Sequence, residues 1–298
     1  MTCQLQNDFR FRRSTLVIIG ALLVLLSSTH PAASQNVSVP RTAAEQRASV
    51  ELNAAAASYR NGDFLEAQRH SEKALEIDPE NRTAPFFVAR CIHARYKPGD
   101  STIENQSVAR EAIVAYQRIL SRFPTDDESY KAIAYIYAAL KEDELLLDWI
   151  LKRGNDTSIS NDKRAEAYVV LASKYWDCSF KITELPTNKR TTVNPSSNRA
   201  TVSYRKPKDE ADFKQAQQCA NQGLQFAELA IALVPDDESA WSYKTNLILE
   251  LSKLAEMTGD VRQKASLVAQ YKDALAKTTK FAELKQKKED PSEDLTFD

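Results

Sequence analysis

Very few side chains in this sequence have the types and spacing that covalent or acid–base chemistry requires. Apart from His30, the histidines are His70 and His93, and neither has a nucleophile or carboxylate at a telling spacing. Cys91 and His93 are two residues apart, which places them on different faces of a helix. The chain has no phosphate-binding glycine loop, no nucleophile elbow and no zinc-protease motif. Acidic residues alternate with Lys and Arg, as on solvated helices. We therefore expect no enzyme activity, no cofactor and no metal site.

The cysteines allow two interpretations. Cys91, Cys178 and Cys219 lie in segments with helical periodicity, whereas Cys3 lies near the N-terminus. In an oxidising compartment one disulfide could form, and Cys178 and Cys219 are the best pair because they flank the same long polar segment. Alternatively, all three are small buried hydrophobic residues on helices, and this is the interpretation that we favour.

The N-terminus has the pattern of a secretory signal peptide. A basic region precedes an uninterrupted apolar run of 12 residues, 15–26, and the small residues Ala32 and Ser34 have the spacing that a signal peptidase reads. We expect cleavage after Ser34, a signal peptide over residues 1–34, a flexible start over residues 35–42, and a periplasmic or secreted protein. The alternative is a membrane anchor formed by residues 15–26, although this run falls short of the roughly 20 residues that span a bilayer.

The composition favours an all-α chain. The 298 residues include only 6 Gly, and helix-forming Ala, Leu, Glu, Lys and Gln are abundant. The formal net charge is -1, so no overall field attracts nucleic acid, and we expect none as a partner.

One helical pattern recurs three times along the chain. A small residue is followed by a second contact four positions later, an apolar pair three positions after that, and a proline that ends the helix. The three sets are Ala67, Ser71, Ala74, Leu75 and Pro79; Ala112, Tyr116, Ile119, Leu120 and Pro124; and Gly223, Ala227, Ala230, Ile231 and Pro235. Acidic and hydroxyl residues follow the last two prolines, where they suit the start of the next helix.

This pattern resembles the tetratricopeptide repeat, a helix–turn–helix unit of about 34 residues. The resemblance is closest in the unit around residues 48–81, and Tyr168, Leu171, Ala172 and Tyr175 stand where the family has its W-x2-L-G-x2-Y positions. It implies a right-handed superhelical array of antiparallel helix pairs, with about five irregular units over residues 43–284. The charged tail, residues 285–298, is expected to be disordered.

A long polar insert, residues 181–208, interrupts the fourth unit. It contains seven Lys or Arg residues and one acid, and its β-branched runs on either side of NPSSN predict a small β-hairpin. The insert either binds an acidic partner or an anionic surface, or is a solvated mobile loop, and the sequence favours neither. The basic residues singled out here are Lys189, Arg190, Arg199, Arg205 and Lys206.

The resemblance also implies a binding surface, since first helices of successive repeats line the concave face in this family. Carried over by register, the groove would be rich in aromatic residues, which give large contact area at low entropic cost. Its candidate binding residues are Tyr59, Phe86, Arg90, His93, Tyr130, Tyr137 and Trp176.

The function that the sequence favours is that of an exported scaffold that binds a protein or peptide segment in this groove. The main alternative is a structural subunit of a cell-envelope assembly, held at the membrane by an uncleaved N-terminal segment or by the basic insert. A more distant alternative is an enzyme whose site the sequence does not reveal. Membrane contact is expected only if the signal segment is uncleaved.

Overall fold

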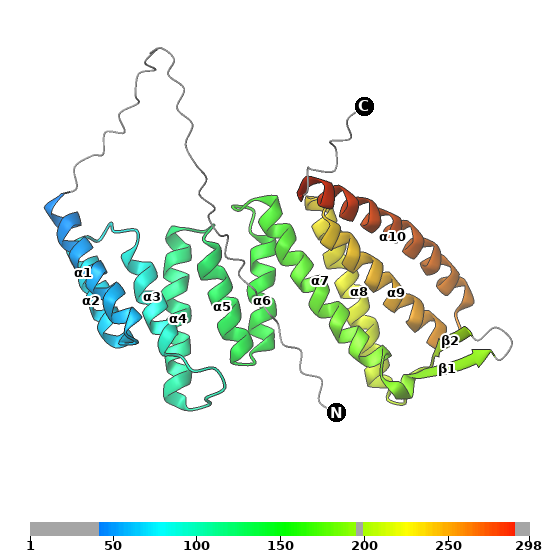
Figure 1. Ribbon diagram of the computed structural model, residues 1–298. Helices are drawn as coiled ribbons and strands as arrows, with labels where there is room; N and C mark the ends of the chain where they lie inside the picture. Colours follow the sequence, from blue (N-terminus) through cyan, green and yellow to red (C-terminus); the bar gives the residue numbers. More distant parts are fainter. Residues whose placement is uncertain (1–41, 195–198, 290–298) are drawn as a thin grey trace, which may run out of the picture. The chain divides into compact units, whose positions relative to one another are not determined.

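A computed structural model describes residues 42–194 and 199–289 (Figure 1). The expected signal peptide, its cleavage site and residues 290–298 lie outside these ranges. Within them, no helix is long and apolar enough to cross a membrane. The elements are α1 (Ala43–Arg60), α2 (Phe64–Ile77), α3 (Ala84–Arg95), α4 (Ile103–Arg122), α5 (Asp127–Ala139), α6 (Asp143–Asn155), α7 (Asn161–Thr183), the 3-10 helix η1 (Pro186–Asn188), β1 (Lys189–Asn194), β2 (Arg199–Tyr204), α8 (Glu210–Leu233), α9 (Glu238–Thr258) and α10 (Val261–Glu289).

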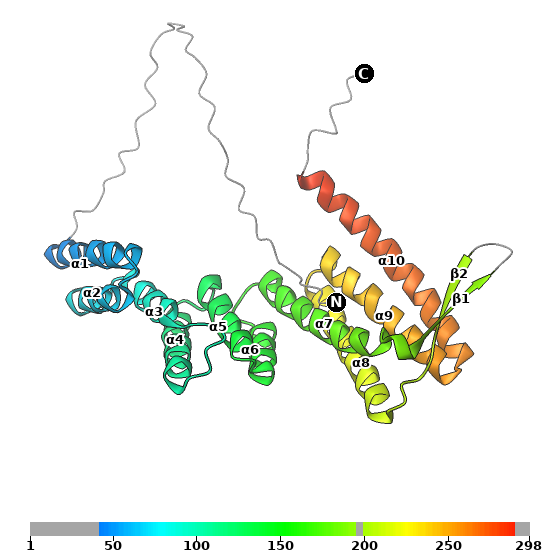
Figure 2. The ribbon, with the colours of Figure 1, turned by 60° about the horizontal axis from the view of Figure 1, so that its bottom comes forward.

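Residues 42–194 and 199–289 fold as an all-α array of antiparallel helix pairs with one β-hairpin inserted. Each helix packs on the next along the chain, from α1 on α2 through to α9 on α10 (Figures 1 and 2). Acidic residues after the prolines start helices as expected: the carboxylate of Asp126 accepts from the Ser129 amide at 2.8 Å, and that of Asp237 from the Ser239 amide at 2.8 Å. The predicted fold class is confirmed.

The recurring sequence pattern marks the faces on which neighbouring helices meet. Its first three positions are buried on all three helices: Ala67, Ser71 and Ala74; Ala112, Tyr116 and Ile119; and Gly223, Ala227 and Ala230. Gly223 shows why a small residue is needed, because a Cβ there would lie 2.6 Å from Cδ2 of Leu247 on α9. Any larger residue at this position would force Leu247 to shift, so glycine favours the close approach of α8 to α9.

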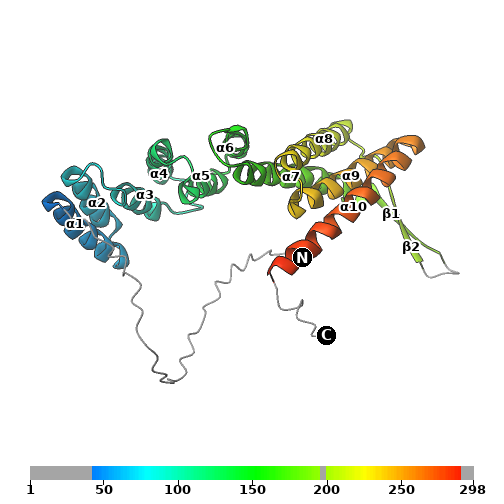
Figure 3. The same ribbon diagram turned by 90° about the horizontal axis from the view of Figure 1, so that it is seen from above.

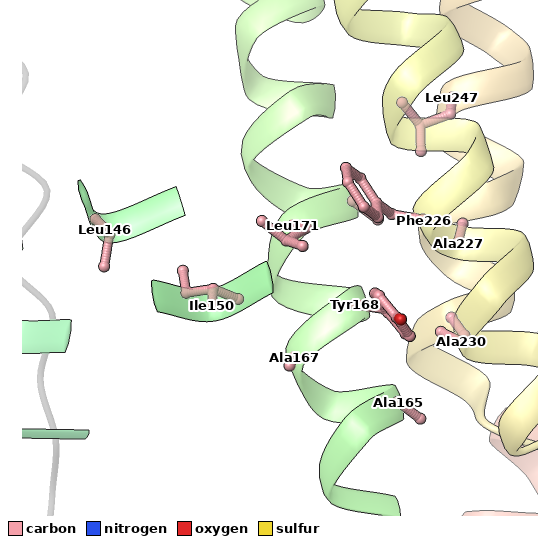
Figure 4. Packing of buried hydrophobic residues seen from close by; sticks show 12 residues of the cluster. Leu146, Ile150, Ala165, Ala167, Tyr168, Leu171, Phe226, Ala227, Ala230 and Leu247 are labelled. Atoms are coloured by element: carbon pink, nitrogen blue, oxygen red, sulfur yellow. The ribbon is translucent and has the colours of Figure 1, made fainter. Parts of the chain in front are cut away.

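The largest group of buried side chains joins α6 to α9. Tyr168 and Leu171 on α7 pack against Phe226 and Ala227 on α8, and Leu247 comes from α9 (Figure 4). A second group, built from α3, α4 and α5, fills the preceding part of the array with Ile, Ala and Tyr side chains. Because each group spans three or four consecutive helices, the interior is continuous along the chain rather than divided at each repeat.

The insert forms the predicted β-hairpin, shown beside α9 and α10 in Figure 3. Strands β1 and β2 are antiparallel, with Lys189 opposite Tyr204 and Asn194 opposite Arg199. The hairpin is shorter than the expected insert because α7 continues to Thr183. At the other end of the chain, α10 runs to Glu289, so residues 285–289 are helical where a disordered tail was expected. Continuation of the α10 helix past its last packed turn accounts for this difference.

Cys178 on α7 and Cys219 on α8 form a disulfide, with their Cα atoms 6.0 Å apart. Our preference for three separate buried thiols is therefore corrected, and among the described cysteines only Cys91 is a buried free thiol. The periodicity of each helix predicted burial, but the pairing depends on how α7 and α8 are rotated against each other. The bond closes the 41-residue stretch that contains the hairpin.

Candidate functional site

Aromatic side chains from four helices gather around one cleft of about 510 Å³. We call it the tyrosine cleft, and its lining residues are Tyr59, Arg90, His93, Ala94, Tyr96, Pro98, Tyr116, Glu128, Ala132 and Tyr135. They come from α1, α3, α4 and α5 and from the loop after α3. A short surface thus collects five aromatic rings, the residue type that contributes most binding energy at protein interfaces.

His93 lies at the centre of these rings. Its Nδ1 is 3.2 Å from the Tyr116 hydroxyl oxygen, the two rings meet edge to face at 5.8 Å, and the Tyr135 ring is 5.7 Å away. Burial lowers the pKa of His93 below its ordinary 6.5, so the imidazole is neutral at pH 7. Tyr135 is 51% exposed. The partly buried His93 and the buried Tyr116 therefore form the floor of the cleft, and Tyr135 offers an accessible ring.

The charges of the tyrosine cleft cancel one another. Nε of Arg90 lies 3.6 Å from a carboxylate oxygen of Glu128, and both side chains are more than half exposed. An ion pair this open to solvent contributes little to stability, typically below about 1 kcal/mol. With His93 neutral, the cleft has no net charge, so apolar and aromatic groups suit it better than a strongly charged ligand.

The structure brings together three of the seven predicted groove residues: Tyr59, Arg90 and His93. Phe86 stacks on Phe123, with ring centroids 5.9 Å apart. Trp176 packs against the rings of Phe180 and Tyr243. Tyr137 is partly buried between the two large apolar groups.

Tyr130 lies away from the tyrosine cleft. Its ring stacks on Trp149 at 5.7 Å, and the Arg153 guanidinium lies 4.0 Å from the ring centroid. Arg153 is buried and ion-paired with Asp127. These residues line a separate cleft of about 430 Å³ between α4, α5 and α6. The Arg153 charge there is already paired, whereas Lys152 and Asp156 also line this cleft.

The tyrosine cleft does not use the face of α5 that was chosen by register. Tyr130 and Tyr137 were predicted for the groove, whereas Glu128, Ala132 and Tyr135 line the tyrosine cleft. The two sets are two residues apart, which is about 200° around a helix, so they lie on nearly opposite faces of α5. The Tyr130 face of α5 packs on α6: the Trp149 ring stacks on the Tyr130 ring, and Trp149 Nε1 donates to the Tyr130 carbonyl oxygen at 3.2 Å.

Three tyrosines of the cleft were not predicted as binding residues: Tyr96, Tyr116 and Tyr135. Tyr116 stands in the recurring pattern, which indicated packing rather than binding. Tyr96 follows the last residue of α3, where no helical face could be assigned. Tyr135 could have been found as the one large aromatic residue on the face of α5 opposite Tyr130 and Tyr137.

The basic residues of the insert are partly neutralised within the molecule. Lys189 is 2.7 Å from Glu184, and Lys206 is 2.7 Å from Glu210 and 4.6 Å from the Phe213 ring centroid. Nη2 of Arg205 donates to the Lys189 carbonyl oxygen at 3.2 Å. Arg190 is exposed, and the side chain of Arg199 lies outside the described part of the chain. In the described ranges, no group of three or more His, Cys, Asp or Glu residues is placed to hold a metal.

No protein-family model matches the chain, and no curated protein matches it. Among solved structures, it is similar to MamA of Desulfovibrio magneticus RS-1 from residue 41 onward, with 12% identity, a TM-score of 0.37, and coverage of 83% of this chain and 100% of that one. It is also similar to pilF of Pseudomonas aeruginosa, with 13% identity, a TM-score of 0.34, and coverage of 83% and 100%. A tetratricopeptide repeat protein of Parabacteroides merdae gives 14% identity, a TM-score of 0.31, and coverage of 80% and 90%. These values describe the general arrangement of helices and nothing finer.

Proposed function

We propose that this protein is an exported scaffold that binds a segment of another protein in the tyrosine cleft. The observation that carries the proposal is the meeting of five aromatic rings in one uncharged cleft, with Tyr135 half exposed beside the His93–Tyr116 floor. Aromatic rings give large contact area with few rotatable bonds, so they bind apolar anchors at low entropic cost. The expected ligand is a segment that inserts an apolar or aromatic side chain between Tyr135 and Tyr59.

Export is part of this proposal. The basic and apolar N-terminal regions followed by small residues have the pattern of a signal peptide. The Cys178–Cys219 disulfide supports the same location, because structural disulfides persist in oxidising compartments and are rare in reducing ones. Intact-mass measurement of the protein from fractionated cells tests it directly. Loss of residues 1–34 and release into the soluble envelope fraction are expected, whereas full-length protein in the membrane fraction would favour the anchor.

Site-specific photocrosslinking in the native cell tests the cleft. A benzophenone amino acid replaces Tyr135 in one variant and Val114, an exposed residue of α4 that does not line the cleft, in a matched control. We expect a discrete protein adduct at position 135, absent at position 114, and lost when His93→Ala is added. Identical adducts at both positions, or none at position 135, would contradict the proposal. Circular dichroism of each variant checks that the helices are intact.

A further inference from the structure

The base of the β-hairpin is fixed to the helices by a dense polar network. Nζ of Lys253 on α9 lies 2.7 Å from a Glu184 oxygen, which also accepts from the Tyr204 hydroxyl at 2.9 Å. The backbone N–H of Tyr204 donates to Glu256 of α9 at 3.0 Å. Lys253 is only 6% exposed. A two-stranded hairpin alone is marginally stable in water, so these contacts are what hold the strands in a fixed position.

The hydrogen-bond phase of the hairpin determines which backbone groups point outward. The Arg205 amide donates to the Asn188 carbonyl oxygen at 2.8 Å, one step below the Lys189–Tyr204 pair. Bonded and non-bonded pairs alternate in an antiparallel ladder. Thr191 and Val193 are therefore in non-bonded pairs, and their N–H and C=O groups lie along the outer edge of β1. On the β2 edge, Glu256 already takes the outward N–H of Tyr204.

The two faces of β1 differ in chemistry. Thr191 and Val193 share one face with Val202 of β2, and Val193 and Val202 are 58% and 45% exposed. Arg190 lies on the opposite face. Residues 185–208 contain six Lys or Arg and no acidic residue. Lys189 and Lys206 are paired with Glu184 and Glu210, so the cation that β1 itself offers to a partner is the exposed Arg190. The edge thus combines unpaired backbone groups, an exposed β-branched face and an accessible positive charge.

We propose that the outer edge of β1 binds an extended, acidic segment of a partner protein as a third strand. Strand addition supplies hydrogen bonds to the outward groups of Thr191 and Val193, and alternate side chains give specificity. The matching segment alternates β-branched residues, which pack beside Thr191 and Val193 of β1, with Asp or Glu on the Arg190 face.

Charge argues against the two other occupants. Two copies of β1 paired edge to edge would bring two basic strands together, and like charges opposite one another destabilise a sheet. A membrane would attract the cations, but hydrocarbon offers no partner for the outward backbone groups of Thr191 and Val193. Only an acidic polypeptide satisfies both the charge and the backbone.

A displayed library of octapeptides that alternate Val, Ile or Thr with Asp or Glu is the probe, and binding of recovered peptides is measured by fluorescence anisotropy. Thr191→Pro removes an outward N–H from the β1 edge, and Val202→Pro, the matched control, removes one from the β2 edge. Both positions lie in the same non-bonded pair, where proline costs no ladder hydrogen bond. We expect Thr191→Pro to weaken binding at least about tenfold and Val202→Pro to leave it within about twofold.

Three further measurements make the outcome decisive. Peptides N-methylated at alternate amides should lose binding to the unmodified protein, which tests strand addition without any change in the chain. Arg190→Glu should weaken binding about tenfold at low salt and less at high salt. No enrichment, equal loss in both proline variants, or retained binding of the N-methylated peptides would overturn the proposal. So would binding to phosphatidylcholine–phosphatidylglycerol vesicles that competes with the peptides.

Discussion

Replacement of Lys253 by Met should remove the one cation that, among the described residues, contacts the buried carboxylate of Glu250 on α9. Glu250 is 1% exposed, and its two oxygens accept hydrogen bonds from Lys253 at 2.5 Å, Thr183 at 2.6 Å and Ser179 at 3.2 Å. Without the ammonium, a negative charge stays in the interior with two hydroxyls as its neighbours. Breaking a buried ion pair from one side typically costs about 3–5 kcal/mol, so we expect this loss in the free energy of unfolding.

The size of the effect separates a buried charge from ordinary lost packing. Adding Glu250→Gln to the Lys253→Met variant removes the stranded charge while an amide keeps hydrogen-bonding capacity, so the double variant should recover most of the lost stability. The remaining loss reflects the contact of Lys253 with Glu184, which keeps Lys189 and the Tyr204 hydroxyl as partners. Lys244→Met, which breaks the more exposed pair with Glu228, is the control and should cost below about 1 kcal/mol.

Urea unfolding followed by tryptophan fluorescence and far-ultraviolet circular dichroism measures all four free energies. If Lys253→Met lowers the free energy of unfolding no more than Lys244→Met does, the buried Glu250 carboxylate does not depend on Lys253 for its stabilisation, and the reasoning fails. If the double variant is less stable than Lys253→Met alone, the cost arises from packing rather than from the charge.

Three further predictions concern Gly223, the Glu184 carboxylate and the disulfide. Gly223→Ala should lower the free energy of unfolding in urea by about 1–3 kcal/mol, because the new methyl group meets Leu247. Gly259→Ala is the control: its methyl group would lie in open space, but its backbone has a positive φ, so this variant measures backbone strain without crowding. Burial acts to raise the pKa of Glu184, but hydrogen bonds from its lysine and tyrosine neighbours outweigh burial and lower it to about 2. The carboxylate therefore stabilises the fold above pH 4.5, and stability measured from pH 6 to pH 2 should fall as Glu184 takes up a proton, a slope that Glu184→Gln should reduce. Replacement of both Cys178 and Cys219 by Ala should cost about 4 kcal/mol from the 41-residue closed loop, and a loss below about 1 kcal/mol would show that the bond constrains little.

Features that depend on short-range pattern could be predicted from the sequence. The spacing that begins at Ala67, Ala112 and Gly223 identified the packed faces, since a helical stripe of small residues has few other uses. The β-branched runs on either side of NPSSN located the hairpin, and the acidic residues after Pro124 and Pro235 located helix starts.

Features that depend on how helices rotate against one another could not be predicted. The groove face of α5 was assigned through Tyr130, but that ring packs on Trp149 of α6, nineteen residues later in the chain. Glu250 and Lys253 have the i, i+3 spacing of an ordinary solvated pair. Only the packing of α7 and the hairpin over them makes that pair a buried one, and no local signal distinguishes the two cases.

The two ends of the array are fastened very differently. The segment from α7 to α9 is held by a covalent bond and a buried ionic network. Helix α1 is held by apolar contacts of Ala48 and Leu52 and by the ion pairs of Glu51 with His70 and Lys73 of α2, without a covalent bond. In a linear array each unit contacts only its neighbours, so local unfolding begins at the less stable terminus. Amide hydrogens of α1 and α2 should therefore exchange with solvent first, ahead of those of α7 to α9. A ligand bound in the tyrosine cleft would contact α1, α3 and α5 together. Its binding should therefore slow amide hydrogen exchange in α1 and α2.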